Sequence, residues 1–88
     1  MPSSFSRIVL HTTFSTKFRR PLTDPSIEQE LYRVMNAEFK RQGALAIRIN
    51  GVPDHIHAVH TLPRTQSLAH VIQAVKAVSS GWIKSLNP

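Results

Sequence analysis

Residues 51–60, Gly-Val-Pro-Asp-His-Ile-His-Ala-Val-His, constrain the fold of this chain more than any other stretch. Glycine, proline and aspartate favour turns, so residues 51–54 predict a turn. Apolar and polar residues alternate over residues 55–62, which predicts a strand, and residues 44–50 alternate in the same way before the turn. The sequence therefore predicts two neighbouring antiparallel strands, and with them a sheet.

Two histidines lie on one face of the second of these strands. Successive side chains of a strand point to opposite faces, so His55 and His57 point the same way, with β-carbons about 6 to 7 Å apart from twice the rise per residue. Ile56 and Ala58 supply the apolar opposite face, and Asp54 adds a carboxylate beside the pair. Two imidazoles so placed can bind one metal ion. The alternative is that both are partly exposed strand residues, hydrogen-bonded to their neighbours.

The flanking segments predict one more strand and two helices. Residues 6–15 are rich in β-branched and aromatic residues and predict a strand, in which Ile8, Leu10, Thr12 and Phe14 share one face and His11 lies on the other. A helix begins at Asp24, a candidate N-cap, and ends at Gly43. A second helix begins after Ser67 and runs to about Leu86.

Apolar residues recur at helical spacing in both helices and predict their buried faces. In the first helix the stripe comprises Ile27, Leu31, Val34, Met35 and Phe39, and Tyr32 falls beside it. In the second it comprises Leu68, Val71, Ile72, Val75, Val78, Trp82 and Leu86, so Trp82 is interpreted as a core residue. In the strand over 44–50, Leu45, Ile47 and Ile49 are expected to share one face.

The predicted order is β-α-β-β-α, an α+β arrangement that matches five of the six elements of the ferredoxin-like split β-α-β fold, without its fourth strand. In such an antiparallel sheet the strand over 55–62 lies between the other two, and both helices cover the face that carries Ile56. His55 and His57 are then expected on the uncovered face, together with His11. His60 faces the helices and His70 lies on the second helix, so both are interpreted as structural.

Composition places the chain among small basic soluble domains. Its 88 residues predict one domain spanning 1–88, with a formal charge of +6 from eleven Lys and Arg against five Asp and Glu. Cysteine is absent, which excludes disulfides and thiolate metal sites. No apolar run reaches the roughly 18 residues of a membrane span, and residues 1–6 do not resemble a secretory signal, so a cytoplasmic protein is expected. The charge predicts a polyanionic partner, such as nucleic acid, or a generically basic surface.

Four segments in order carry a resemblance to a known family: residues 10–20, residues 51–57 with the His-Ile-His sequence, residues 62–68 and residues 75–82. Together they resemble the IS200-like single-tyrosine transposases, including their REP-associated relatives, within the HUH endonucleases (His, bulky hydrophobic, His). The resemblance implies cutting and rejoining of single-stranded or hairpin DNA through a 5′-phosphotyrosine, a divalent cation such as Mg²⁺ or Mn²⁺ held by His55 and His57, and a homodimer. The residues expected to contact DNA are Lys17, Arg19, Arg20, Arg64 and Lys76.

The chain departs from the family pattern in its tyrosine. The family carries its nucleophile on a helix after the fourth strand, with a further metal ligand, and the sequence ends before both. The one tyrosine, Tyr32, lies on the first helix, so no catalytic residue is assigned, and a truncated, catalytically deficient member is expected. Two alternatives stay open: a non-catalytic dimeric nucleic-acid-binding module, and a small metallohydrolase using His11 or Asp54 with the histidine pair.

Overall fold

The computed structural model describes residues 8–15, 25–52 and 55–86. The elements are β1 (Ile8–Ser15), α1 (Pro25–Arg41), β2 (Ala46–Val52), β3 (His55–Leu62) and α2 (Leu68–Ser85). This confirms the predicted α+β class and the β-α-β-β-α order.

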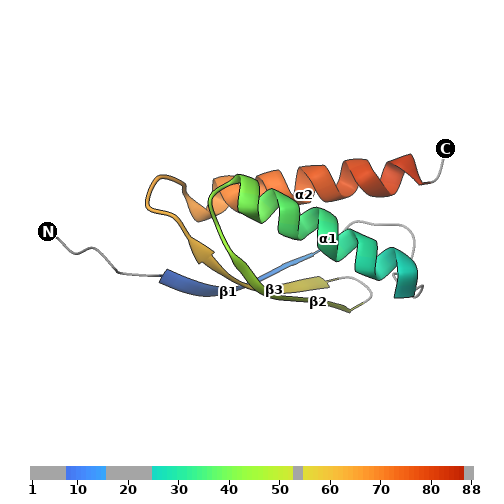
Figure 1. Ribbon diagram of the computed structural model, residues 1–88, viewed down its shortest axis with the longest axis horizontal. Helices are drawn as coiled ribbons and strands as arrows, with labels where there is room; N and C mark the ends of the chain where they lie inside the picture. The colour runs from blue at the N-terminus through green and yellow to red at the C-terminus, as the bar shows by residue number, and fades with distance from the viewer. Residues whose placement is uncertain (1–7, 16–24, 53–54, 87–88) are drawn as a thin grey trace, which may run out of the picture.

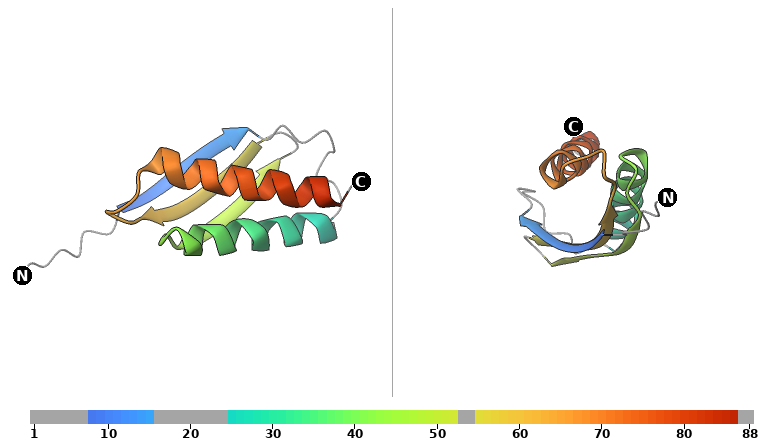
Figure 2. Two further views of the ribbon diagram at one scale, coloured as in Figure 1. Left: turned by 90° about the horizontal axis from the view of Figure 1, so that it is seen from above. Right: turned by 90° about the vertical axis from the view of Figure 1, so that its left-hand side faces the viewer.

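The three strands form an antiparallel sheet in the order β1-β3-β2. The histidine-bearing strand is therefore central, as expected for a ferredoxin-like arrangement. Both helices lie on one side of this sheet, so the described elements form two layers and none of them covers the opposite face, called the open face below (Figures 1 and 2).

The core lies between the helices and the sheet. In α1, Leu31, Met35 and Phe39 follow one another at four-residue steps, and all three are fully buried. From the sheet, the alternation of β3 turns Ile56 and Ala58 toward the same layer. Each fully buried apolar side chain of the larger kinds contributes about 1.5–3 kcal/mol relative to an exposed one. These contacts hold α1 over the sheet.

The buried face of α2 differs in part from the predicted one. Val71 and Val75 are buried as expected, and Trp82 packs against the core, but the next residue to be buried is Ser79. Val78 remains 38% exposed because residue 79, four positions after Val75, follows the line that faces the core. The Ser79 hydroxyl donates to the Val75 carbonyl oxygen at 2.7 Å, which satisfies the buried polar group.

A bulge in β2 also changes a predicted face. Ala46 pairs with His60 and Arg48 with Val59, so Ile47 is an extra residue between them. Ala46 and Ile49 consequently pack against the core, while Ile47 is 55% exposed. The prediction that residues 45, 47 and 49 share a face was therefore wrong, because the extra residue reverses the alternation partway along the strand.

The described ends of β2, α1 and α2 can each be explained by residues at or next to them. β2 continues through Gly51, which pairs with Ile56, so the predicted turn begins later than residue 51. Gly43 adopts φ +86° after α1, a conformation that glycine reaches without strain, and it ends the helix as predicted. At α2 the Ser67 side chain accepts a hydrogen bond from the His70 amide at 3.1 Å, which confirms the predicted cap. The proposed N-cap of α1, Asp24, lies outside the described residues.

Candidate metal and nucleic-acid site on the open sheet face

The uncovered face of the sheet carries a row of polar side chains across its three strands. Because β3 alternates, His55 and His57 both point away from the helices, and both are half-buried. The register places Thr13 of β1 and Asn50 of β2 on either side of His57, and Ser15 of β1 beside His55. The predicted pair thus lies on the central strand, toward the end of the sheet where β1 and β2 end.

His57 has two neighbours on β1 that hold its ring. Its Nδ1 lies 3.2 Å from the Thr13 hydroxyl oxygen, within hydrogen-bond distance. The His11 ring lies beside it, with ring centroids 5.7 Å apart and a tilt of 53°. The expectation that His11 shares the face of the pair is confirmed.

His60 lies on the same face of β3 as Ala58, the face that packs against the helices. It is fully buried beneath α1, with its ring centroid 4.7 Å from that of Phe39. Its Nε2 is 2.9 Å from the Thr12 hydroxyl, and its Nδ1 lies 2.8 Å from the Thr61 carbonyl oxygen. Both ring nitrogens are therefore engaged inside the protein, as expected of a structural histidine.

The donors on the open face suit a divalent transition-metal ion. Imidazole binds ions such as Mn²⁺ or Zn²⁺ more readily than Mg²⁺, which prefers oxygen ligands. Within residues 8–15, 25–52 and 55–86, no three His, Cys, Asp or Glu side chains lie close enough to hold an ion together. His55 and His57 are therefore a pair of candidate ligands, and His11 does not join them as a third. Asp54 lies outside the described residues.

The distribution of charge favours an anion on the sheet. The acidic residues of the described elements are Glu28, Glu30 and Glu38, all on α1. The three strands contain no Asp or Glu over their described lengths, and they carry Arg48, which is exposed at the outer strand β2. A phosphate approaching the histidines therefore meets no carboxylate on the strands themselves.

The predicted DNA contacts are only partly placed. Lys17, Arg19 and Arg20 lie outside the described residues, although they follow β1 directly in the sequence. Arg64 is exposed in the turn after β3, at the end of that strand remote from His55. Lys76 is exposed on α2, on the helical side of the sheet.

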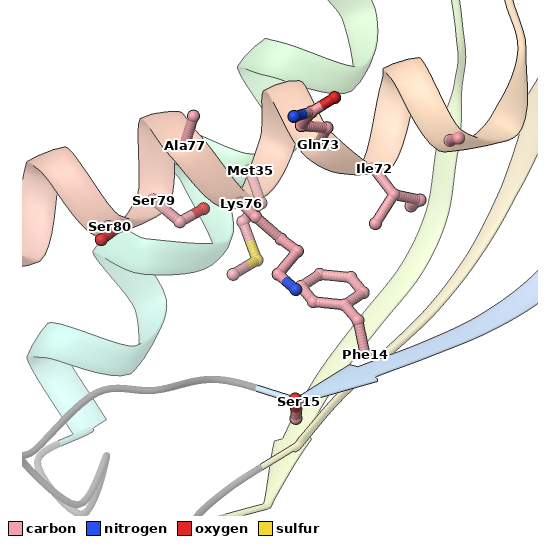
Figure 3. Close-up of a pocket in the computed structure, with 10 residues that line it drawn as sticks. Phe14, Ser15, Met35, Ile72, Gln73, Lys76, Ala77, Ser79 and Ser80 are labelled. Atoms are coloured by element: carbon pink, nitrogen blue, oxygen red, sulfur yellow. The ribbon is translucent and has the colours of Figure 1, made fainter.

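A cavity of about 600 Å³ lies on the helical side, between α2 and the end of β1. Lys76 extends from α2 toward the Phe14 ring in this cavity, and Met35 contributes from α1 (Figure 3). Among the described residues that line it, Lys76 is the one ionisable side chain. The histidine pair lies on the other face of the sheet.

Tyr32 lies between α1 and β2, on the helical side of the sheet. Its hydroxyl donates to Glu28 Oε1 at 2.7 Å. A β-carbon added at Gly51 would lie 2.7 Å from the Tyr32 hydroxyl oxygen, so the tyrosine side chain packs closely against this part of β2. Burial, and then the bond to Glu28, raise the pKa of Tyr32 well above its ordinary value.

The sequence did not reveal two features of the site. The contact between Thr13 and His57 joins residues 44 positions apart, and only the β1–β3 register brings them together. Arg48, the basic residue of described strands that carry no Asp or Glu, was also not singled out from the sequence. Polar residues at positions 7, 11 and 13, on one face of the predicted first strand, were the available signal for the first.

Comparison with known proteins identifies one family. A protein-family model described as "Transposase IS200 like" matches residues 4–88. No curated protein matches the chain.

Among solved structures, a crystal structure of a protein from Deinococcus radiodurans R1, described as a candidate transposase, has the same fold. It aligns with a TM-score of 0.81 over 100% of this chain and 70% of that chain, at 16% sequence identity. Over the part of the chain that the structure describes, neither helix is long and apolar enough to cross a membrane.

Proposed function

The chain belongs to the IS200-like transposase family, and from this premise we propose that it binds single-stranded or hairpin DNA across the open sheet face, beside a divalent cation held by His55 and His57. One observation carries the proposal. The two histidines come from the central strand, on the face opposite the two described helices, in a sheet whose described strands carry no acidic residue.

The chain's own residues would bind and orient the nucleic acid. When bound, a divalent cation at the pair supplies charge that polarises a phosphodiester and offsets negative charge on its oxygens. His55 and His57 are the residues that would hold it, and the two-imidazole donor set fits Mn²⁺ better than Mg²⁺. Lys17, Arg19 and Arg20, which follow β1 in the sequence, would bind neighbouring phosphates of the backbone.

We further propose that these 88 residues bind DNA without forming a phosphotyrosine. The sequence contains one tyrosine, and Tyr32 lies on the helical side, hydrogen-bonded to Glu28 and with a raised pKa. The histidines lie on the other side of the sheet. A phosphate held by them is therefore separated from the phenol by the sheet itself.

Binding is tested with a fluorescent hairpin carrying a single-stranded flank, titrated with and without Mn²⁺ over a range of salt concentrations. We expect affinity that falls steeply with salt and rises with Mn²⁺. Replacing both His55 and His57 by alanine should remove the Mn²⁺ effect, whereas His70→Ala, at an exposed histidine of α2, should retain it. A Mn²⁺ effect that survives the double substitution would contradict the assignment of the pair.

Cleavage is tested by incubating the protein with the hairpin and Mn²⁺ and separating denatured products by size. We expect free DNA and protein with no covalent adduct. An adduct that disappears in Tyr32→Phe would overturn the proposal that this chain binds without cutting.

The second candidate function is a homodimeric nucleic-acid-binding module that needs no metal. It is favoured by exposed apolar side chains on both outer strands of the described sheet, Val9 at 50% and Leu45 and Ile47 beside or within β2 at 58% and 55%. Outer strands with such side chains readily pair with a second chain. DNA binding that is unchanged by the double histidine substitution, with a dimer in sedimentation, would favour it; a monomer at high concentration would exclude it.

A further inference from the structure

Two adjacent threonines of β1 each contact a histidine of β3, on opposite faces of the sheet. Thr12 lies beside His60 on the covered face, and Thr13 lies beside His57 on the open face. The β1–β3 register pairs Thr12 with Ala58 and Thr13 with His57, so each threonine follows the alternation of its own strand. The same side-chain pair, threonine with histidine, thus occurs once in the core and once at the candidate site.

The direction of the hydrogen bonds is determined at the buried pair. The Thr61 carbonyl oxygen can only accept, so His60 Nδ1, at 2.8 Å, must carry the proton and donate. In a neutral, fully buried imidazole, Nε2 then has a lone pair and accepts from the Thr12 hydroxyl at 2.9 Å. Thr12 is therefore a donor.

We propose that Thr13 has the reverse role: its hydroxyl oxygen accepts from His57 Nδ1–H, which leaves the Nε2 lone pair of His57 facing outward for a divalent cation. This inference rests on the proposed function, in which His57 holds the cation. Thr13 is a positioning residue in this arrangement. It fixes the tautomer and the ring orientation of His57 and does not itself contact the cation.

The physical basis is the general behaviour of metal-binding histidines. Such a histidine donates the N–H of its second nitrogen to an oxygen, and this bond selects the nitrogen that is free to bind. In a free neutral histidine the Nε2–H form predominates, and that form has no lone pair at Nε2. When Thr13 accepts in the 3.2 Å contact, that bond stabilises the Nδ1–H tautomer, and the His11 ring packs beside His57.

The first experiment measures the tautomer of His57 in the metal-free protein, from long-range proton–nitrogen correlations in a ¹⁵N-labelled sample. Wild type should show the Nδ1–H form. Thr13→Val, which has the same shape without the hydroxyl, should shift His57 toward Nε2–H, and Thr13→Ser should restore the wild-type spectrum. Thr12→Val is the matched control, since it removes the neighbouring hydroxyl on the other face and should leave the His57 signals unchanged.

The second experiment measures Mn²⁺ affinity by electron paramagnetic resonance for the same variants. Removing an outer hydrogen-bond partner of a metal-binding histidine weakens binding about 10-fold or more, so Thr13→Val should lose at least that much. Thr13→Ser and Thr12→Val should bind like wild type, although Thr12→Val should lower the unfolding temperature.

The outcomes separate this inference from the proposed function. If wild type binds no Mn²⁺, or binds it without His55 and His57, the proposed function fails, and the tautomer measurement still decides the role of Thr13. If wild type binds Mn²⁺ through the pair but Thr13→Val binds it equally well, the role of Thr13 is excluded and the proposed function stands. An Nε2–H tautomer of His57 in metal-free wild type also overturns the inference.

Discussion

The two faces of β3 differ although their residues alternate along one strand. On the face toward the helices, Ile56, Ala58 and His60 are fully buried, whereas His55 and His57 on the other face are half-buried. The covered face has its polar groups paired inside the protein, and the open face has imidazoles accessible to solvent. The difference indicates that the covered face supplies stability, while side chains on the open face can change with little effect on folding.

Truncation of a covered aromatic residue should give the largest effect. Phe39→Ala removes a fully buried side chain that packs against His60, and should destabilise the protein by about 3–5 kcal/mol. Val9→Ala, on the open face and 50% exposed, should have an effect of at most about 1 kcal/mol. Urea unfolding followed by circular dichroism measures both, and equal losses would remove the distinction between the faces.

The histidines of β3 allow a comparison with the same residue type on both faces. His60→Ala removes a buried ring and leaves the Thr12 hydroxyl and the Thr61 carbonyl without their partner, so we expect a loss of about 2–4 kcal/mol. His57→Ala should change stability by no more than about 0.5 kcal/mol and should weaken Mn²⁺ binding. Unfolding and metal titration of the two variants test this; a stability loss at His57 as large as that at His60 would contradict it.

Gly51 tests how closely α1 covers the edge of the sheet. In Gly51→Ala the new β-carbon would lie 2.7 Å from the Tyr32 hydroxyl oxygen and 3.2 Å from Ile56 Cδ1, so we expect a loss of about 1–2 kcal/mol from overpacking. Tyr32→Phe removes the hydroxyl, and in that background the loss should be smaller by about 1 kcal/mol. A double-mutant cycle by urea unfolding gives this coupling, and additive effects would show that the tyrosine moves aside freely.

The smallest effect concerns alkaline pH. The folded protein holds the Tyr32 proton to higher pH than the unfolded chain, because burial and the bond to Glu28 raise its pKa. The contribution of this group is complete below the ordinary tyrosine pKa of about 10, and above it the unfolded chain ionises first, so stability falls as pH rises. Tyr32→Phe has no phenol to ionise, so its stability does not fall for this reason. Between about pH 9 and about pH 11 the difference in unfolding midpoint between wild type and Tyr32→Phe should therefore shrink as pH rises; a constant difference would exclude the effect.

Local patterns predicted most of the fold. The strand His55–Leu62 and the cap at Ser67 were predicted to the residue, because alternation and capping depend on neighbours in the sequence. The bulge at Ile47 was missed, because a bulge places two residues of one strand opposite one residue of its partner, and this pairing depends on β3 as well as on β2. Ser79 was missed for a related reason: its hydroxyl is satisfied within the helix, so a polar residue could take a buried position.

The candidate site was predicted in outline. His55 and His57 share a face by alternation alone, and the β1-β3-β2 order that follows from the element order places His11 on that face. The Thr13 contact depends on a register that the sequence of either strand alone does not contain. The basic residues after β1 carry much of the predicted DNA binding, but they lie outside the described residues.

The bulge in β2 also determines where the length of this chain can change. Deleting Ile47 would leave Ala46 and Arg48 consecutive opposite His60 and Val59, which is a regular ladder, and would keep Ile49 and Gly51 on their present faces. If one residue among 48, 49 and 50 were deleted instead and the bulge at Ile47 remained, the rest of β2 would have its inward and outward side chains exchanged. Among related sequences, we therefore expect single-residue gaps in this strand to fall at position 47.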